Sequence, residues 1–66
     1  MRKVHVDFNR IDVDGRIVVG LKVEDEPLTV GQKVELWQAG EPDMVFEGTV
    51  DEITDSGRYK IKVDWV

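Results

Sequence analysis

Hydrophobic and polar residues alternate along most of the chain with the period of two that half-buried β-strands show. The alternation is centred on residues 28–50, LTVGQKVELWQAGEPDMVFEGTV. Val34 and Leu36 share one face of a first strand, and the pattern resumes at Met44 after a loop predicted at residues 40–43. Two apolar runs joined in this way predict a β-hairpin. Because an isolated hairpin is not stable in water, the rest of the chain must cover it.

The apolar face of this hairpin predicts which residues lie opposite one another. The expected cross-strand pairs are Val34 with Gly48, Glu35 with Glu47, Leu36 with Phe46 and Trp37 with Val45. Phe46 then faces the core, whereas Trp37 points outward. The Glu35–Glu47 pair is unfavourable unless a lysine lies beside it. The last strand offers Lys60 and Lys62 for that position.

The N-terminal third predicts one strand and a second hairpin. Val4, Val6 and Phe8 alternate with polar residues, and the slip in phase before Ile11 predicts a bulge at Asn9. A three-residue loop, residues 13–15, keeps the apolar residues of the hairpin on one face if Gly15 is left-handed. This loop pairs Ile11 with Ile17 and Asp12 with Arg16. The returning strand carries Ile17, Val19, Leu21 and Val23 on its apolar face.

The C-terminal third predicts a closing strand. A second slip in phase places a bulge at residues 51–52, and residues 55–57 form a second three-residue loop with a left-handed Gly57. The apolar face of the closing strand carries Tyr59, Ile61, Val63 and Trp65. No segment has a helical period. About five strands with tight glycine turns and two bulges predict an all-β fold, a small five-stranded barrel of antiparallel hairpins.

Composition narrows the classes of protein to consider. With 66 residues the chain has room for one domain, residues 1–66, and 41% hydrophobic residues suit a globular fold. The chain has no cysteine, which removes disulfides and thiolate metal sites and is compatible with a cytoplasmic location. Fourteen acids against nine bases give a formal charge of −5, which disfavours long-range attraction to nucleic acid.

Targeting signals are not expected. The stretch MRKVHVDFNR has no apolar core and no small-residue cleavage site, so we expect no signal peptide. No apolar run approaches the roughly 20 residues that span a bilayer. We therefore expect a cytoplasmic protein that binds no membrane.

The central and C-terminal strands carry a resemblance to SH3-like small barrels. The resembling runs are VGQKVELW, FEGTVDEI and YKIKVDW, within Leu28 to Trp65. They match a strand after a V-G turn, a strand with G-x-V, and a closing strand that ends near a tryptophan. The resemblance implies a small five-stranded barrel. The ALYDY-like run of signalling SH3 domains is absent, so recognition of proline-rich peptides is not implied.

A second run, GRIVVGLKVEDEPLTVGQKVEL, is similar to the β-barrel domain II of translation GTPases. The matching positions are Gly20, Leu28, Val30, Gly31, Val34 and Leu36. The chain has no GTP-binding segment, so this resemblance implies barrel geometry only.

The sharpest candidate site is the surface around the outward tryptophan. It comprises Trp37, Gln38, Glu41, Pro42 and Val45. An outward aromatic ring with an apolar neighbour suits a platform for a peptide or a base. The alternative is that Trp37 covers a barrel end or packs on Pro42. Trp65 and Tyr59 are expected in the core.

A second candidate is the basic face formed by Arg58, Lys60 and Lys62. Such a stripe suits nucleic acid, and the alternative is ion pairing with Glu47 and Glu52. His5 stands alone and is expected to be a solvated side chain. The acids at positions 12, 14 and 24–26 lack the spacing of a calcium loop. We therefore expect no metal and no cofactor.

No nucleophile–base pair or phosphate-binding loop is present, so we expect no enzymatic activity. The first functional hypothesis is a small acidic module that binds a protein or peptide through the Trp37–Pro42 surface. One alternative is an RNA-associated barrel of the domain II type. Another is a structural domain that acts only within an oligomer or a complex with an operon partner.

Overall fold

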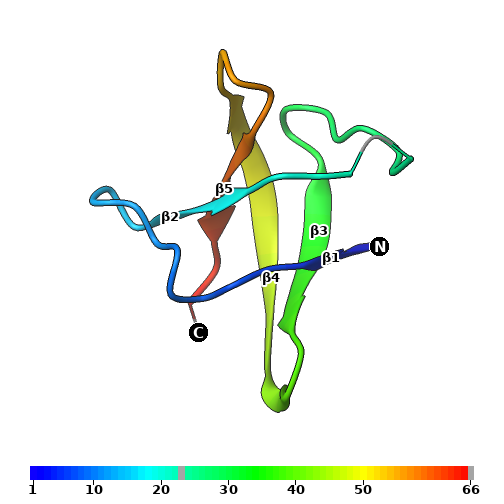
Figure 1. The fold of residues 1–66 in the computed structure, drawn as a ribbon. Coiled ribbons are helices and arrows are strands. Elements are labelled where there is room, and N and C mark those ends of the chain that lie inside the picture. The colour runs from blue at the N-terminus through cyan, green and yellow to red at the C-terminus, as the bar shows by residue number, and fades with distance from the viewer. Residues whose placement is uncertain (23, 66) are drawn as a thin grey trace.

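The structure is a computed structural model that describes residues 1–22 and 24–65, and it is all-β in these ranges (Figure 1). A single sheet contains five strands in the order β1-β3-β4-β5-β2. Three of the four neighbouring pairs are antiparallel, whereas β1 runs parallel to β3. The strands are β1 (Arg2–His5), β2 (Arg16–Val19), β3 (Lys33–Gln38), β4 (Glu41–Ile53) and β5 (Tyr59–Val63).

The sheet is not closed, and its two edges are β1 and β2. Both edge strands cross the line of the β3–β4–β5 strands at a steep angle (Figure 1). No Cα atom of β1 lies within 8 Å of a Cα atom of β2. The expectation of antiparallel hairpins alone was wrong for β1. β1 pairs in parallel with β3, a strand that is distant in sequence. Residues 6–12 then connect β1, beside β3, to the hairpin that contains β2.

The predicted register of the central hairpin is confirmed. The four expected pairs are all present, from Val34 with Gly48 to Trp37 with Val45. The bulge predicted at residues 51–52 is also confirmed, because Val50 pairs with Ile61 whereas Glu52 pairs with Lys60. The residue left between them on β4, Asp51, has no partner on β5 in this register.

The loop predicted at residues 40–43 was wrong. β4 begins at Glu41, so the turn consists of Ala39 and Gly40, whose φ is +82°. The register shifts after Trp37, because Gln38 pairs with Glu41 instead of continuing the ladder. Pro42 lies in this irregular stretch, outside the regular ladder, so its lack of an N–H costs no cross-strand hydrogen bond. Extended backbone therefore replaces the expected loop.

Both predicted three-residue loops are confirmed. Gly15 and Gly57 each have a φ of +81°. The N–H of Asp12 donates to the carbonyl of Arg16 at 2.7 Å, and residues 54 and 58 close the second loop at the same distance. An isolated bridge joins Ile11 to Ile17, as expected.

The strand after the first loop is shorter than predicted. β2 ends at Val19, which lies opposite Tyr59, the first residue of β5. Residues beyond Val19 therefore have no place on β5 to pair with. Leu21 is only half-buried, and Val23 lies outside the described residues.

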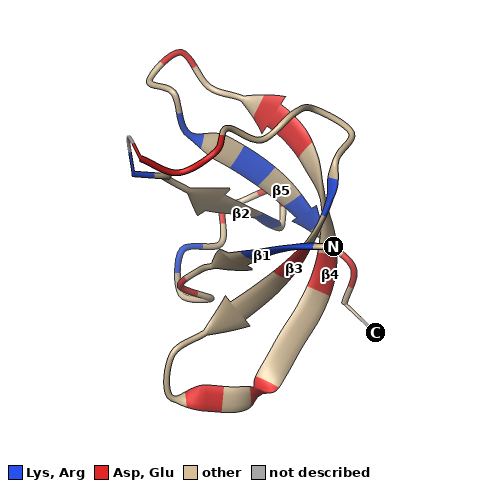
Figure 2. Ribbon diagram, turned by 90° about the vertical axis from the view of Figure 1, so that its right-hand side faces the viewer, with Lys and Arg blue, Asp and Glu red and all other residues tan. Residues whose placement is uncertain are grey.

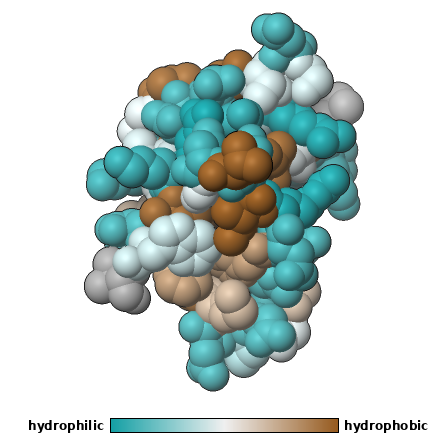
Figure 3. All heavy atoms as spheres, turned by 90° about the vertical axis from the view of Figure 1, so that its left-hand side faces the viewer, coloured by the Kyte–Doolittle hydropathy of each residue, from teal (hydrophilic) through white to brown (hydrophobic). Residues whose placement is uncertain are grey.

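The core lies on the inner face of the sheet and involves every strand. Its buried apolar residues are Val4, Val6, Phe8, Ile17, Val19, Leu28, Val34, Leu36, Val50, Tyr59, Ile61 and Val63. Phe46 and Met44 are only partly buried against it. Figure 3 shows apolar side chains at the surface in the middle of one face, with polar side chains around them. The core residues themselves are at most 8% exposed, so these surface side chains are additional to the core.

The expectation that Trp65 belongs to the core was wrong. Its side chain is 48% exposed, although Val63 on the same strand face is buried. β5 ends at Val63, and beyond it Trp65 packs against Phe46, at 5.0 Å between ring centroids, and Phe8, at 6.1 Å. The expected partial exposure of Trp37 is confirmed, at 39%.

Gly48 supplies a first test of the packing. A Cβ atom at this position would lie 2.7 Å from Cγ2 of Ile61 and 3.0 Å from Cδ1 of Leu36. We expect Gly48→Ala to lower the free energy of unfolding by about 1–3 kcal/mol, because these stiff side chains must move. Gly20→Ala is the control, since its Cβ would meet no atom within 4 Å. Equal unfolding midpoints in urea for the two variants would contradict this packing.

The two tryptophans supply a second test. Since their exposed fractions are close, we expect acrylamide to quench the Trp37→Phe and Trp65→Phe variants with similar constants. Each variant retains one tryptophan, so each constant reports one ring. A ring at position 65 that is several-fold better shielded than the ring at position 37 would restore the core assignment.

Candidate functional site

Trp37 is held on the outer side of β3 by a histidine from β1. The parallel register places His5 beside Trp37, and their ring centroids lie 4.7 Å apart in an edge-to-face arrangement. Nε2 of His5 accepts a hydrogen bond from the N–H of Ala39 at 3.3 Å. His5 is exposed, as expected of a solvated side chain, and it also contacts Trp37 and Ala39. It joins β1 to the turn after β3 and fixes one edge of the indole ring.

Trp37 and His5 also line a groove, which we call the β1 groove. Its volume is about 600 Å³, and it runs between β1 and residues 20–22, 24 and 25. A neighbouring hollow of about 260 Å³ shares His5 and Gly20 with it. The described lining residues of the β1 groove are Arg2, Lys3, Val4, His5, Gly20, Leu21, Lys22, Glu24, Asp25 and Trp37.

The structure brings only part of the predicted Trp37 surface together. Val45 lies opposite Trp37 and is 46% exposed, so the two form an apolar pair on the outer face. Gln38 has a structural role, since its Oε1 accepts the N–H of Phe8 at 2.9 Å. Glu41 and Pro42 are exposed beyond the turn and do not line the β1 groove.

Sequence reasoning missed the contribution of β1 to this surface. Lys3 and His5 alternate with buried valines, which indicated that they point outward. The strand beside which they lie was not predictable, because periodicity identifies the face of a residue and not its neighbour.

One residue of the predicted basic face is paired with a carboxylate: Nζ of Lys60 lies 3.0 Å from Oδ2 of Asp12. Glu52 is the cross-strand partner of Lys60, but the ion pair is made with Asp12. Arg58 and Lys62 are exposed. Figure 2 shows the basic bands of β5 close to acidic bands at the end of β4.

Arg16 on β2 is the centre of the same charge network. Its guanidinium donates to Asp14 at 2.6 Å, to Asp51 at 2.8 Å and to Glu52 at 3.4 Å. The bulge in β4 brings Asp51 within reach of β2. The arrangement ties the two strands that flank β5 together across its outer face.

The network shifts the ionisation of its members. Hydrogen bonds from Lys60 and then from the N–H of Val13 lower the pKa of Asp12. The hydrogen bond from Arg16 lowers the pKa of Asp14. Asp12 in turn raises the pKa of Lys60. These groups are held in their charged forms, which suits ion pairing and not proton transfer at neutral pH.

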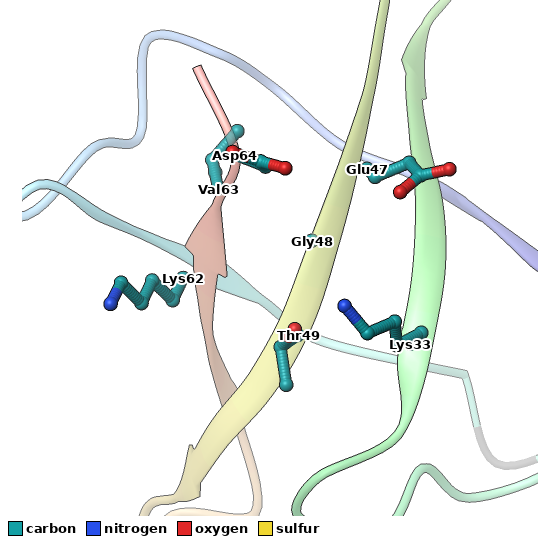
Figure 4. Close-up of a pocket in the computed structure, with 7 residues that line it drawn as sticks. All are labelled: Lys33, Glu47, Gly48, Thr49, Lys62, Val63 and Asp64. Carbon is teal, nitrogen blue, oxygen red and sulfur yellow. The ribbon is translucent and has the colours of Figure 1, made fainter. Parts of the chain in front are cut away.

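A shallow depression of about 240 Å³ lies on the outer face of β3, β4 and β5 (Figure 4). Lys33, Thr49 and Lys62 line one end, and Glu47 and Asp64 line the other. Opposite charges at the two ends give the depression no uniform preference for a cation or an anion.

No group of three or more histidine, cysteine, aspartate or glutamate side chains in residues 1–22 and 24–65 is arranged to hold a metal ion. Within the same ranges, no helix has the length and apolar character to cross a membrane. Comparisons with known proteins found no matching family model, no matching curated protein and no matching solved structure. The site must therefore be interpreted from its own geometry.

The Asp12–Lys60 pair predicts a specific change at low pH. A lowered folded-state pKa means that Asp12 contributes stability above its ordinary pKa of 3.8, and this contribution disappears as the pH falls through the folded-state pKa. We expect Lys60→Met to raise the pKa of Asp12 toward the ordinary value, measured by carboxyl ¹³C NMR titration. Lys62→Met, two residues along the same strand, is the matched control. An unchanged Asp12 pKa in Lys60→Met would refute the pair.

Proposed function

We propose that this protein is a small non-enzymatic binding module that holds a protein or peptide segment against Trp37 and the adjoining β1 groove. The observation that carries the proposal is the partial exposure of Trp37, 39%, with its ring packed on His5. Exposed aromatic rings that are already positioned bind partners at a low entropic cost. Val45 extends the apolar contact on one side, and the groove extends it on the other.

The fold proposed for this module is an SH3-like small barrel. Its support is the path of residues 10–12, which leave the β1 side and return to β2. The carbonyl of Arg10 accepts the N–H of Val18 at 3.2 Å, and Ile11 bridges to Ile17. These contacts draw the two sheet edges toward each other at one end.

The charge distribution favours a protein partner over RNA. The formal charge of the chain is −5, and Lys60 and Arg16 are engaged by carboxylates. Phosphate binding by Lys60 or Arg16 would require their ion pairs to break. A catalytic role also has little support, because the charged network on β2 and β5 consists of satisfied ion pairs.

Peptide selection tests the proposed function. A library of random 12-residue peptides displayed on phage is selected on the immobilised protein, and the affinities of enriched peptides are measured by titration. We expect Trp37→Ala to weaken binding at least tenfold, because an aromatic anchor contributes well over 1 kcal/mol. Trp65→Ala is the control, since that ring is similarly exposed but lies outside the β1 groove.

The outcomes of this test are distinct. Equal affinities for the two variants would place the binding surface elsewhere. Failure to select any binding peptide would refute the proposal. Binding of polynucleotide that weakens steeply with salt would support the RNA-associated alternative instead.

A further inference from the structure

The outer edge of β1 presents main-chain groups that bond to no described residue. The N–H of Val6 donates to the carbonyl of Trp37 at 2.8 Å, so Val6 directs its main-chain groups toward β3. Alternate residues of a paired strand direct these groups to opposite sides. Those of Lys3 and His5 therefore point away from β3, and within the described ranges no main-chain hydrogen bond satisfies them.

The wall of the β1 groove opposite β1 is formed by residues that follow β2. The loop end of the first hairpin is closed, because Asp12 bonds to Arg16 and Val18 bonds to Arg10. On the N-terminal side of Arg10 the chain forms a turn, in which the N–H of Arg10 donates to the carbonyl of Asp7 at 2.9 Å. Before this turn, β1 lies beside β3 and away from β2. Residues 20–22 continue past β2 without joining a strand. The segments on the two sides of the first hairpin therefore diverge into a fork, with β1 on one side and residues 20–22 on the other. The β1 groove lies in this fork.

The two sides of the fork do not pair with each other. No Cα atom of β1 lies within 8 Å of β2, so the two cannot pair directly. A strand placed beside β1 would find the outward main-chain groups of Lys3 and His5, whereas the N–H and the carbonyl of Lys22 on the opposite wall both bond to Asp25.

The walls of the groove indicate which side chains such a strand would carry. Val4 is buried and Leu21 is half-buried against the core, so inward positions face apolar surface. Lys3 and His5 point outward, and Lys3 is 74% exposed although its Nζ lies 4.0 Å from Oε2 of Glu35. The two hollows of the fork contain four of the nine basic residues but only three of the fourteen acids. An acidic side chain on the outward face is therefore complementary to this part of an otherwise acidic protein.

We propose that the β1 groove binds one extended segment of a partner protein, which adds as a sixth strand along the outer edge of β1. The segment has apolar side chains facing Val4 and Leu21 and an acidic side chain facing outward beside Lys3. Main-chain hydrogen bonds supply affinity, and the alternating side chains supply specificity. This inference rests on the proposed function and specifies how the peptide is held.

Amide hydrogen exchange tests the mode of binding, with a phage-selected 12-residue peptide as the probe. We expect the peptide to slow exchange of the Lys3 and His5 amides at least tenfold. The amide of Val4 is the internal control, because its bond to β3 exists already. If Trp37→Ala weakens the peptide while the Lys3 and His5 amides exchange as before, binding stands and strand addition is refuted. If no peptide binds, both proposals fail.

Two variants at one position separate the main chain from the side chain. Lys3→Ala removes the ammonium group and keeps the N–H, whereas Lys3→Pro removes both at an edge where proline is tolerated. We expect Lys3→Ala to weaken the peptide about threefold and Lys3→Pro at least tenfold further, with folding checked by NMR. Equal affinities would refute main-chain pairing, unless Lys3→Pro is unfolded, in which case N-methylated peptides replace it. N-methylation without effect at every central position would then refute pairing.

The remaining outcomes concern the occupant. A peptide whose acidic residue is replaced by lysine should bind at least threefold more weakly, and equal binding would refute the acidic preference. Slow exchange of the Lys3 and His5 amides that appears without peptide, and grows with protein concentration, would assign the groove to a second copy of this chain and overturn the partner-protein proposal.

Discussion

The close approach of three strands at Gly48 sets the packing of the whole sheet. A single added carbon at this position would overlap Ile61 and crowd Leu36, two side chains with no exposed surface. The core residues of β3 and β5 therefore meet directly beneath β4. In a domain of this size the core is small, so its stability depends on such contacts being dense. β1 and β2 then add buried side chains at the two sides of the unit formed by β3, β4 and β5.

The two sides of the sheet are stabilised by different interactions. On the inner side, the burial of apolar side chains holds the strands together. β5 ends at Val63, so Trp65 lies beyond the strand and contacts the aromatic rings of Phe8 and Phe46. On the outer side, Arg16 and Lys60 gather carboxylates from the first hairpin and from the bulge in β4. Exposed pairs of this kind contribute little individually. They engage Lys60 of the basic stripe on β5, whereas Arg58 and Lys62 of that stripe are exposed.

An unclosed sheet has a consequence for binding. Edge strands with unpaired main-chain groups invite pairing with other chains, and natural proteins usually cover them or charge them. Here Lys3 and His5 place polar side chains along the β1 edge, while the groove beside it remains open. A charged edge next to a positioned tryptophan is compatible with selective pairing, since it opposes indiscriminate association but still accepts a complementary strand. Trp37 and the β1 groove thus belong to one surface.

The sequence alone determined the features that depend on local pattern. Alternation predicted the register from Val34 to Val45, and glycine with its neighbours predicted both three-residue loops. The slip in phase after Val50 predicted the bulge in β4. In each case the face on which a side chain must lie leaves a single register that keeps the apolar residues together.

Only the tertiary structure decided which strands became neighbours. The parallel pairing of β1 with β3 joins residues more than thirty positions apart, and no local pattern encodes it. Because of that pairing His5 meets Trp37, Gln38 is used to bond Phe8, and a groove opens along β1. Trp65 has the parity of a core residue, but β5 ends before it. Periodicity specifies the direction of a side chain, whereas its burial depends on what the rest of the chain places against it.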